Sequence, residues 1–545
     1  MAKQLGFYFD QTLCTGCKAC QVACKDKNDL PVGVTWRRVA EYSGGTWQQE
    51  GDTFTPNVFT YYTSISCNHC DEPACVQVCP TTAMHKDEHG IVTIDDGKCV
   101  GCRYCEWACP YGAPQYDKNA GVMTKCDLCI DRANAGEQPA CVAACPSRAL
   151  EFGEIEELRA KYGDTAAIGV QNARPPHDPP QPGHHPPPRR PAHRPRHRRH
   201  RQPRGDLMNV HELPLVAFTI LAQMSVGSFV VLGVIHLAGI RKHGHSAVDK
   251  LSDPALYAIG PAIVLGMAGS MLHLGNPLNA LNAINHLGSS WLSREIFFGS
   301  AFACMGAAFA VVQWRRWLTP MLRQVLAGLT ALVGLALVYC MSMVYMLPTV
   351  PAWNHWATPV TFFTTTFLLG ALAVGAALVI AYQYRQRATA KVLVTADIAA
   401  GADADAGETP EVEAPAAAVV ADDADGAATS SLLRSSLRWI ATASIVMLGV
   451  EFVVLPIYAL DLANGNVNAQ ASAAILMSGG GVYLIARLVL VFAGAGLLGF
   501  FLYRFAGKGA ERRLVYLATS AFVLVLASET IGRLLFYSSF DRIGI

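Results

Sequence analysis

The first part of this chain is defined by a short stretch of closely spaced cysteines, CVGCRYCEWACP (Cys99–Pro110). The same C-x₂-C-x₂-C-x₃-C spacing occurs nearer the N-terminus, in CTGCKACQVAC (Cys14–Cys24). Two further groups of four have other spacings, in CNHCDEPACVQVC (Cys67–Cys79) and between Cys126 and Cys145. Sixteen of the 18 cysteines therefore lie in the first 145 residues.

This crowding indicates iron–sulfur clusters. A cubane cluster needs four thiolates, and in such runs three close cysteines wrap one cluster while the fourth ligates its neighbour. A lone C-x₂-C pair would suit zinc equally well. Four groups of four, three of them followed by a proline (Pro80, Pro110 and Pro146), are not typical of zinc. We interpret the sixteen cysteines as ligands of four clusters and predict electron transfer. A polytopic membrane protein with a zinc-binding head is the alternative from another class.

Composition divides the chain into three parts. Residues 1–170 hold the cysteines, strand-like runs such as Val58–Ser64 and Gly90–Ile94, and little other apolar core, so that cluster bonds replace part of a core. Residues 171–207 consist largely of Pro, Arg and His and predict a disordered linker. Residues 208–545 are strongly apolar. The net charge of +1 gives no argument for nucleic-acid binding.

The linker suggests a hypothesis of its own. Codons for Pro, Arg and His can share a first base, so a GC-rich gene read out of frame yields such a run. Met208 would then start a second polypeptide, and the native protein would be two chains, near residues 1–205 and 208–545. The arginine-rich linker also precedes a span whose N-terminal end should face outward. Arginine-rich segments normally stay in the cytoplasm, so this position violates the charge rule for membrane topology.

Residues 208–545 contain eight apolar stretches long enough to span a bilayer, because a spanning helix needs roughly 20 such residues. They are Leu213–Ile235, Ala255–Leu274, Leu292–Val312, Val325–Met346, Val360–Tyr382, Ile440–Ala459, Tyr483–Tyr503 and Leu514–Tyr537. The acidic, alanine-rich stretch Thr395–Thr429 predicts a disordered loop. We expect an α+β double-ferredoxin-like iron–sulfur domain, followed by an all-α polytopic bundle of eight transmembrane helices.

Loop charges predict the orientation of the bundle. The loops after spans one, three, five and seven are rich in Arg and Lys, whereas those after spans two, four and six carry almost none. Basic loops are cytoplasmic, so both ends of the membrane domain should face outward. The segment Met1–Gln11 does not read as a cleavable signal.

Two ionisable residues predict a quinol site. His273 ends the second span and Glu295 begins the third, at the end that charge counting places outside. Ionisable groups in spans cost roughly 2.5–3.5 kcal/mol on insertion scales, so each suggests a role. Quinol oxidation releases two protons and two electrons, and this pair supplies a proton acceptor beside a hydrogen-bonding group. Alternatively, both are ordinary polar residues at the membrane interface.

Other polar and aromatic residues of the spans have structural interpretations. Glu529 and Arg533, four apart on one helix face, predict an internal neutralising pair. Glu451 and Arg487 predict a pair across helices, or a contribution to the quinol pocket. Trp353, like Trp356, suits an aromatic belt at the membrane interface.

The first part resembles the four-cluster electron-transfer subunit of the dimethyl sulfoxide reductase family. The resemblance rests on CTGCKACQVACKD (Cys14–Asp26), SCNHCDEPACVQVCP (Ser66–Pro80), CVGCRYCEWACPYGAPQY (Cys99–Tyr116) and KCDLCIDR (Lys125–Arg132). It implies four [4Fe–4S] clusters whose cysteine groups exchange their fourth members. The implied sets are Cys14, Cys17, Cys20 with Cys145; Cys126, Cys129, Cys141 with Cys24; Cys67, Cys70, Cys75 with Cys109; and Cys99, Cys102, Cys105 with Cys79.

The part from Asn209 to about Tyr537 resembles the eight-helix anchor subunit of the same family, which oxidises menaquinol. The motifs are HELPLVAFTILAQ (His211–Gln223), SMLHLGNP (Ser270–Pro277), LSREI (Leu292–Ile296), TVPAWNHWATP (Thr349–Pro359) and SETIGRLLFY (Ser528–Tyr537). That family uses the matching His and Glu, here His273 and Glu295, at its quinol site.

The two resemblances together imply a non-catalytic subunit of an anaerobic respiratory complex in the bacterial inner (cytoplasmic) membrane. Its iron–sulfur domain would lie on the outer, periplasmic face and pass electrons from the menaquinone pool to a separate molybdopterin-containing subunit that reduces an S-oxide or N-oxide. This chain has no molybdopterin region and no dinucleotide fingerprint. The same parts could instead carry electrons from a substrate dehydrogenase into quinone.

Overall fold

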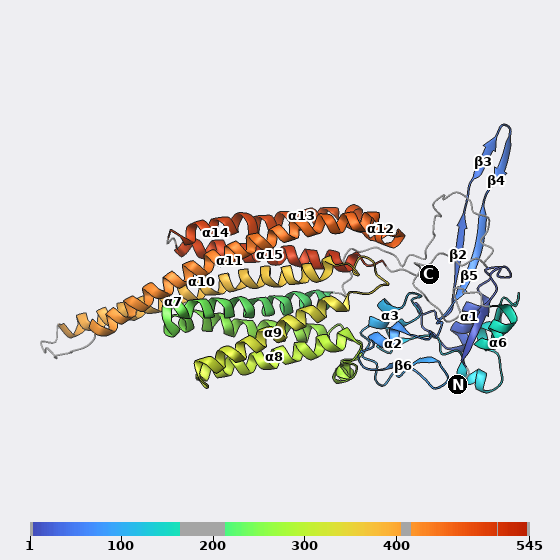
Figure 1. Cartoon of the computed structure of the whole chain (residues 1–545), viewed down its shortest axis with the longest axis horizontal. Coiled ribbons are helices and arrows are strands. Elements are labelled where there is room, and N and C mark those ends of the chain that lie inside the picture. Colours follow the sequence, from blue (N-terminus) through green and yellow to red (C-terminus); the bar gives the residue numbers. More distant parts are fainter. Residues whose placement is uncertain (1–3, 164–212, 405–415, 509–510, 542–545) are drawn as a thin grey trace.

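The computed structural model describes residues 4–163, 213–404, 416–508 and 511–541 of the chain. A bundle of long helices occupies one end of the molecule and a small α+β domain the other (Figure 1). The predicted linker, residues 171–207, lies outside the described residues. The hypothesis that it marks a junction between two native chains therefore stays a hypothesis.

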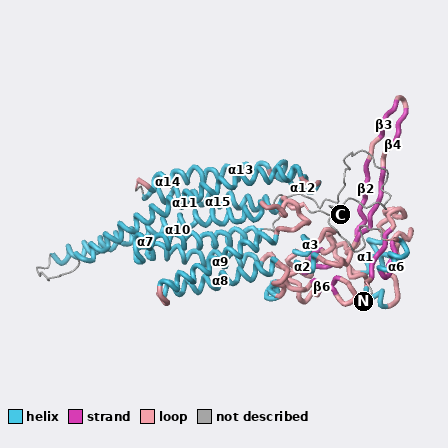
Figure 2. Tube along the Cα trace, in the orientation of Figure 1, coloured by secondary structure: helices cyan, strands magenta, loops and turns pink. Residues whose placement is uncertain are grey.

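The small domain is built from short strands and helices between the cysteine loops. Its described residues form five two-stranded antiparallel sheets, shown in magenta in Figure 2. The pairs are β1 (Leu5–Phe9) with β10 (Leu150–Glu154), β2 (Arg38–Gly44) with β5 (Phe59–Ile65), β3 (Trp47–Glu50) with β4 (Thr53–Pro56), β6 (Met84–Lys86) with β7 (Val92–Ile94), and β8 (Gln115–Asp117) with β9 (Val122–Thr124). The strand-like runs predicted at Val58–Ser64 and Gly90–Ile94 correspond to β5 and β7.

The small domain has six helices among its described residues, and all but the last contain or adjoin a cysteine. They are α1 (Ala19–Lys27), α2 (Ala74–Val78), α3 (Tyr104–Ala108), α4 (Ile130–Asn134), α5 (Ala140–Ala143) and α6 (Ile155–Tyr162). The loops before α1 and α3 have matching backbones, because Gly16 and Gly101 have φ of 71° and 70°, and Lys18 and Arg103 have φ of 63° and 61°. The repeated cysteine spacing therefore folds twice into the same loop, which confirms the double-ferredoxin-like prediction.

The bundle contains eight helices, among the described residues, that are long and apolar enough to cross a membrane. They lie within α7 (Leu213–Met271, which holds spans one and two), α8 (Trp291–Arg315), α9 (Pro320–Val344), α10 (Ala357–Ala404), α11 (Ala416–Asn464), the run α13 (Gly481–Val491), η4 (Phe492–Leu498) and α14 (Gly499–Ala506), and α15 (Glu511–Ser538). Gly244, with φ of 76°, breaks the helical geometry between the first two spans. Two shorter elements, η2 (Pro277–Ile284) and α12 (Val467–Ala474), followed by η3 (Ile475–Gly479), complete the bundle.

Small residues allow close packing between α7 and α10. A Cβ added at Gly227 would lie 1.9 Å from the carbonyl oxygen of Thr366, and one at Gly370 would lie 2.5 Å from the Cα of Gly227. Membrane helices associate mainly by such close contact, because lipid removes the hydrophobic driving force between them. This contact brings together spans that are far apart in the sequence.

The prediction of a disordered loop at Thr395–Thr429 is wrong for most of this segment. Helix α10 continues to Ala404, and α11 begins at Ala416. Both extensions are rich in alanine, which has the highest helix propensity of all residues. Residues 405–415 lie outside the described part of the chain.

Candidate iron–sulfur and quinol sites

The second and third cysteine groups meet around a cavity in the small domain. The cavity is lined by Cys79, Cys99, Cys102 and Cys105 together with apolar residues that include Met84 and Met123. The backbone amides of Met84 and Met123 donate to the Sγ atoms of Cys79 (3.4 Å) and Cys99 (3.5 Å). Four thiols around a cavity, with amides donating to sulfur, fit a [4Fe–4S] cluster, which such bonds also tune.

Electrostatic effects between thiols show which other cysteines lie close together. Burial raises the pKa of Cys75, and the neighbouring Cys67 and Cys109 raise it further. In the same way, burial first and then Cys141 raise the pKa of Cys24.

A similar contact links the first and last groups, since Cys145 lies close enough to Cys20 to raise its pKa, after the larger effect of burial. Each fourth cysteine thus lies beside the group that the resemblance assigns to it. Ligation of iron by these residues stays a prediction.

Compact sites for single metal ions are absent from the part of the chain that the structure describes. No three His, Cys, Asp or Glu side chains there meet closely enough to hold one ion. A tetrahedral zinc site needs four such ligands at about 2.0–2.3 Å from the metal.

The bundle holds the cysteine loops by hydrogen bonds to their backbone. The side-chain amide of Asn279 donates to the carbonyl oxygens of Gly97 (2.9 Å) and Cys99 (3.0 Å). His286 lies with Nδ1 2.9 Å from the carbonyl oxygen of Cys79. Three hydroxyls near the start of α8 make further bonds to carbonyls of the small domain, those of Ser289, Ser290 and Ser293. The loops that carry Cys79 and Cys99 are therefore seated on the bundle.

Glycines form the closest approach between the two domains. A Cβ added at Gly275 would lie 2.0 Å from the carbonyl oxygen of Gly121, and one at Gly101 would lie 2.9 Å from the Cα of Gly275. Beside them the amide of Asn276 donates to the carbonyl oxygen of Val100 (3.1 Å). Only residues without a side chain allow these backbones to touch.

The predicted quinol residues both lie at the bundle end that meets the small domain. His273 is half-buried in the turn after α7, two residues before Gly275. Glu295 lies in the second turn of α8 and is 5% exposed. It faces the cysteine domain, because burial raises the pKa of the Tyr104 phenol and the nearby Glu295 carboxylate raises it further. Tyr104 directly precedes Cys105, so Glu295 lies beneath the third cysteine group.

An aromatic cluster at the same junction was not predicted from the sequence. Trp107 of the small domain packs edge to face on Trp353 with ring centroids 5.4 Å apart, and its carbonyl oxygen accepts from Thr349 (2.6 Å). Trp353 is only 1% exposed, so its prediction as an interface-belt residue is wrong. The reason is that the small domain covers this end of the bundle. Trp356, 47% exposed, agrees with that prediction.

Buried charges inside the bundle pair across helices. Arg487 forms the predicted ion pair with Glu451 and lies 3.8 Å from Glu529. The neutralising pair predicted between Glu529 and Arg533 is wrong, because Arg533 instead donates to the side-chain oxygen of Gln223 (2.9 Å). Neighbouring helices offered partners that the spacing along one helix could not reveal.

Comparison with known families assigns both domains. Residues 208–539 match the family described as DMSO reductase anchor subunit (DmsC). The chain therefore belongs to this family. Residues 58–155 match the 4Fe-4S dicluster domain. The DmsC-type anchor is thus joined, in one sequence, to an iron–sulfur domain.

Relatives of the N-terminal part are components of redox enzymes by name. The B-chain of the anaerobic dimethyl sulfoxide reductase of Escherichia coli (strain K12) is 57% identical over 168 residues, which are 31% of this chain and 82% of that protein. The B-subunit of the sulfite dehydrogenase of Allochromatium vinosum is 39% identical over 176 residues, 28% of this chain and 70% of that protein. The B-chain of the polysulfide reductase of Wolinella succinogenes is 38% identical over 169 residues, which are 31% of this chain and 85% of that protein. The sequence is thus a fusion of the B-chain and DmsC types.

Proposed function

We propose that this chain transfers electrons from menaquinol in the bilayer to a separate molybdopterin-containing subunit. The observation that carries the proposal is the seating of the Cys79 and Cys99 loops on the bundle end that holds Glu295 and His273. A lipid-soluble donor and the cysteine domain would therefore meet at one place. The four cysteine sets would hold four [4Fe–4S] clusters, which supply one-electron carriers.

The chain's own residues would handle the protons of the donor. Glu295, which is buried beside Tyr104, would accept a proton from a quinol hydroxyl. His273 would hydrogen-bond the quinol at the same end of the bundle. Trp107 and Trp353 pack edge to face and add apolar surface to this junction.

The names of the relatives favour a reductase. The relative at 57% identity is a chain of a dimethyl sulfoxide reductase, whereas the sulfite dehydrogenase relative is 39% identical. We therefore propose an S-oxide or N-oxide as the terminal acceptor. Electron flow from a dehydrogenase into quinone is the second candidate. Potentiometric titration of the clusters followed by EPR separates the two, because only potentials above that of menaquinol support its oxidation.

Loop charges support a location of the small domain on the periplasmic side. The turns between the first two spans and between α8 and α9 lie at the bundle end away from the small domain (Figure 1), and the chain there carries Arg241, Lys242, Arg315 and Arg316. Such loops stay in the cytoplasm. Protease added to spheroplasts should therefore cleave the small domain, and protection equal to that of a cytoplasmic marker would contradict this orientation.

The test of the quinol site is Glu295→Gln. This change keeps the size and shape of the residue but removes the proton acceptor, so quinol-driven reduction of the clusters should stop. Reduction by dithionite should remain normal, because the cysteines are unchanged. Glu88→Gln, at a side chain that is 88% exposed, is the matched control. Normal quinol turnover in Glu295→Gln would remove this residue from the mechanism.

The linker between the two domains, residues 171–207, can be tested directly. We propose that the native protein is two chains, separated between residues 205 and 208. Resequencing the gene across the linker and measuring the mass of the membrane-purified protein test this. A single chain of 58.5 kDa, encoded in frame, would refute it.

A further inference from the structure

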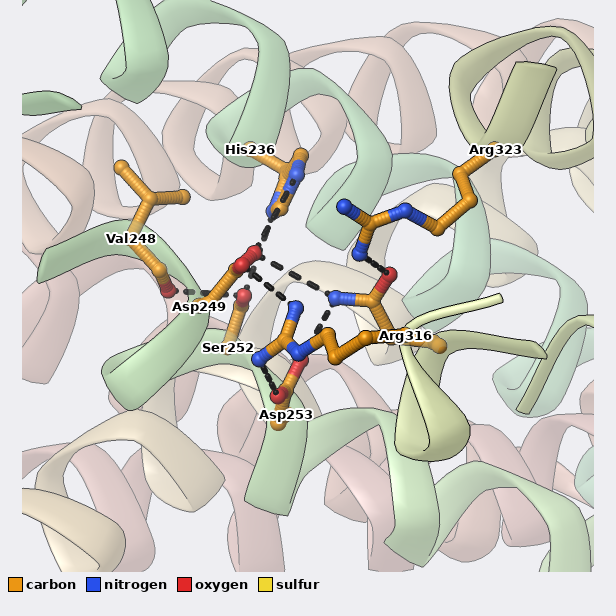
Figure 3. A network of polar contacts seen from close by, with 8 residues as sticks. His236, Val248, Asp249, Ser252, Asp253, Arg316 and Arg323 are labelled. Atoms are coloured by element: carbon orange, nitrogen blue, oxygen red, sulfur yellow. Dashed lines mark hydrogen bonds and ion pairs between the residues drawn. The ribbon is translucent and has the colours of Figure 1, made fainter. Parts of the chain in front are cut away.

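A second polar site is formed by residues near the turn at Gly244 and the end of α8, at the bundle end opposite the one that meets the small domain. Figure 3 shows its polar network. It surrounds a cavity of about 200 Å³. One part of the cavity wall is apolar and includes Phe229, Leu232, Phe309, Ala327 and Ala331. The other part is polar and includes His236, Asp249, Ser252, Asp253, Gln313 and Arg323. The proposed quinol chemistry at Glu295 uses none of these residues.

The polar part of the wall carries both signs of charge. Arg316 donates to Asp249 (2.5 Å) and to Asp253 (2.8 Å). The amide nitrogen of Gln313 lies 3.3 and 3.0 Å from oxygens of the same two carboxylates. The amide oxygen of Gln313 accepts from Arg323 (2.8 Å). Two carboxylates and two guanidinium groups therefore balance, with Gln313 as the link between them.

Arg316 lies against both carboxylates, whereas Arg323 is linked to them through Gln313. Figure 3 shows Asp249 and Asp253 on one side of the network and Arg323 on the other. Within the described part of the chain, Nε of Arg323 is buried and has no hydrogen-bond partner. A buried donor without an acceptor costs about 1–3 kcal/mol. The site thus presents an unused donor at one edge and carboxylates at the other.

From this geometry we infer that the cavity binds a phospholipid whose headgroup carries both a phosphate and an ammonium group. The phosphate would accept from Arg323, because a guanidinium fork matches phosphate geometry. The ammonium group would lie against Asp249 and Asp253. An acyl chain would cover the apolar wall formed by residues such as Phe229 and Phe309. The ligand class is that of phosphatidylethanolamine.

Other amphiphiles fit the cavity less well. An acidic phospholipid brings a negative charge without an ammonium group, so it would leave a net negative charge at a site whose two carboxylates and two guanidinium groups already balance. A quinone is uncharged, so its binding would remove water from these charged groups and replace it with only one or two hydrogen bonds. Those bonds do not offset the lost hydration of the charges. A quinone here would also be separated from the cysteine domain by the thickness of a bilayer, about 30 Å.

The experiment uses the full membrane protein in nonionic detergent micelles to which a small amount of photoactivatable lipid is added. Probes are phosphatidylethanolamine or phosphatidylglycerol with a diazirine on one acyl chain. The ethanolamine probe should label peptides of α8 and α9 that line the cavity, and the glycerol probe should label them about tenfold less. In Arg323→Gln, labelling by the ethanolamine probe should fall about tenfold, as expected when a charged hydrogen bond is lost.

Two further variants keep the test independent of folding defects. Gly328→Leu fills the cavity without touching the charges, because Gly328 lines it and a Cβ there meets nothing within 4 Å. It should lower labelling as Arg323→Gln does. Arg504→Gln, at an exposed arginine outside the cavity, should label like the wild type. Dithionite-reduced cluster spectra show whether each variant is folded.

The inference is overturned by any of three results. The first is equal labelling of folded wild type, Arg323→Gln and Gly328→Leu. The second is labelling by the glycerol probe as strong as by the ethanolamine probe. The third is a quinone, not a phospholipid, retained by wild type and lost from Gly328→Leu in lipid extracts of the purified protein.

Discussion

Replacing Gly275 with alanine should uncouple the cysteine domain from the quinol site without damaging either one. The added Cβ would lie 2.0 Å from the carbonyl oxygen of Gly121, whereas ordinary contacts begin at 3.4 Å. The two backbones must then separate by about 1.4 Å, the difference between these distances. Both contacting groups are backbone, so no flexible side chain can move aside.

That separation would lengthen the hydrogen bonds beside the contact. The amide of Asn276 donates to Val100 at 3.1 Å, and Asn279 donates to Gly97 and Cys99 at 2.9 and 3.0 Å. Each such bond contributes roughly 0.5–1.5 kcal/mol. Loss of all three would weaken the docking of the domains by about 1.5–4.5 kcal/mol, or about tenfold to a thousandfold.

The assay compares two reductants in membrane vesicles. Dithionite should reduce the clusters of Gly275→Ala normally, while reduction by a menaquinol analogue should be slowed at least tenfold, as the weakened docking requires. Gly288→Ala is the control, because a Cβ at Gly288 meets nothing within 4 Å. Quinol-driven reduction of Gly275→Ala at the rate of Gly288→Ala would refute the argument that this contact couples the domains.

Further predictions concern the metal content and the buried charges. Metal analysis of the purified protein should find about sixteen irons per chain, four for each of four clusters, and about four zincs would end the iron–sulfur assignment. Cys102→Ala removes one proposed thiolate, so one cluster should become a three-iron cluster visible by EPR when oxidised; an unchanged spectrum would contradict Cys102 as a ligand. Glu451→Gln leaves Arg487 with less compensation and should destabilise the bundle by about 3–5 kcal/mol. The double variant Glu451→Gln/Arg487→Gln should recover part of this in thermal unfolding in detergent, and no recovery would show that the ion pair is not the cause.

Local patterns in the sequence were enough to predict the two domains. The spacing of Cys99, Cys102 and Cys105 is fixed by a loop whose backbone repeats that of the first group, so the prediction needs no knowledge of distant contacts. The membrane spans are equally local, because length and apolarity define each one. All eight predicted spans correspond to helices of the bundle.

Contacts between distant segments could not be predicted in the same way. Gln313 and Arg323 both lie in the stretch between the third and fourth predicted spans, Leu292–Val312 and Val325–Met346, yet they share a cavity with His236 and Asp249. The prediction that Glu529 pairs with Arg533 failed for the same reason, because Arg487 approaches Glu529 from another helix. Sequence spacing describes one helix face, and these sites are formed by several helices.

Recognition between the two domains relies on the path of the backbone. Asn279, His286 and the serines near the start of α8 bond to carbonyl oxygens, and Gly275 contacts a peptide group. Every residue has a carbonyl oxygen, so these bonds depend on the shape of the cysteine loops, while Trp107 on Trp353 adds a contact that depends on side chains. An anchor of this kind could therefore accept a range of iron–sulfur domains, provided that their loops keep the same trace and glycine stands where the backbones touch. The same anchor surface would then bind different iron–sulfur domains, and other surfaces of each iron–sulfur domain would determine the terminal substrate.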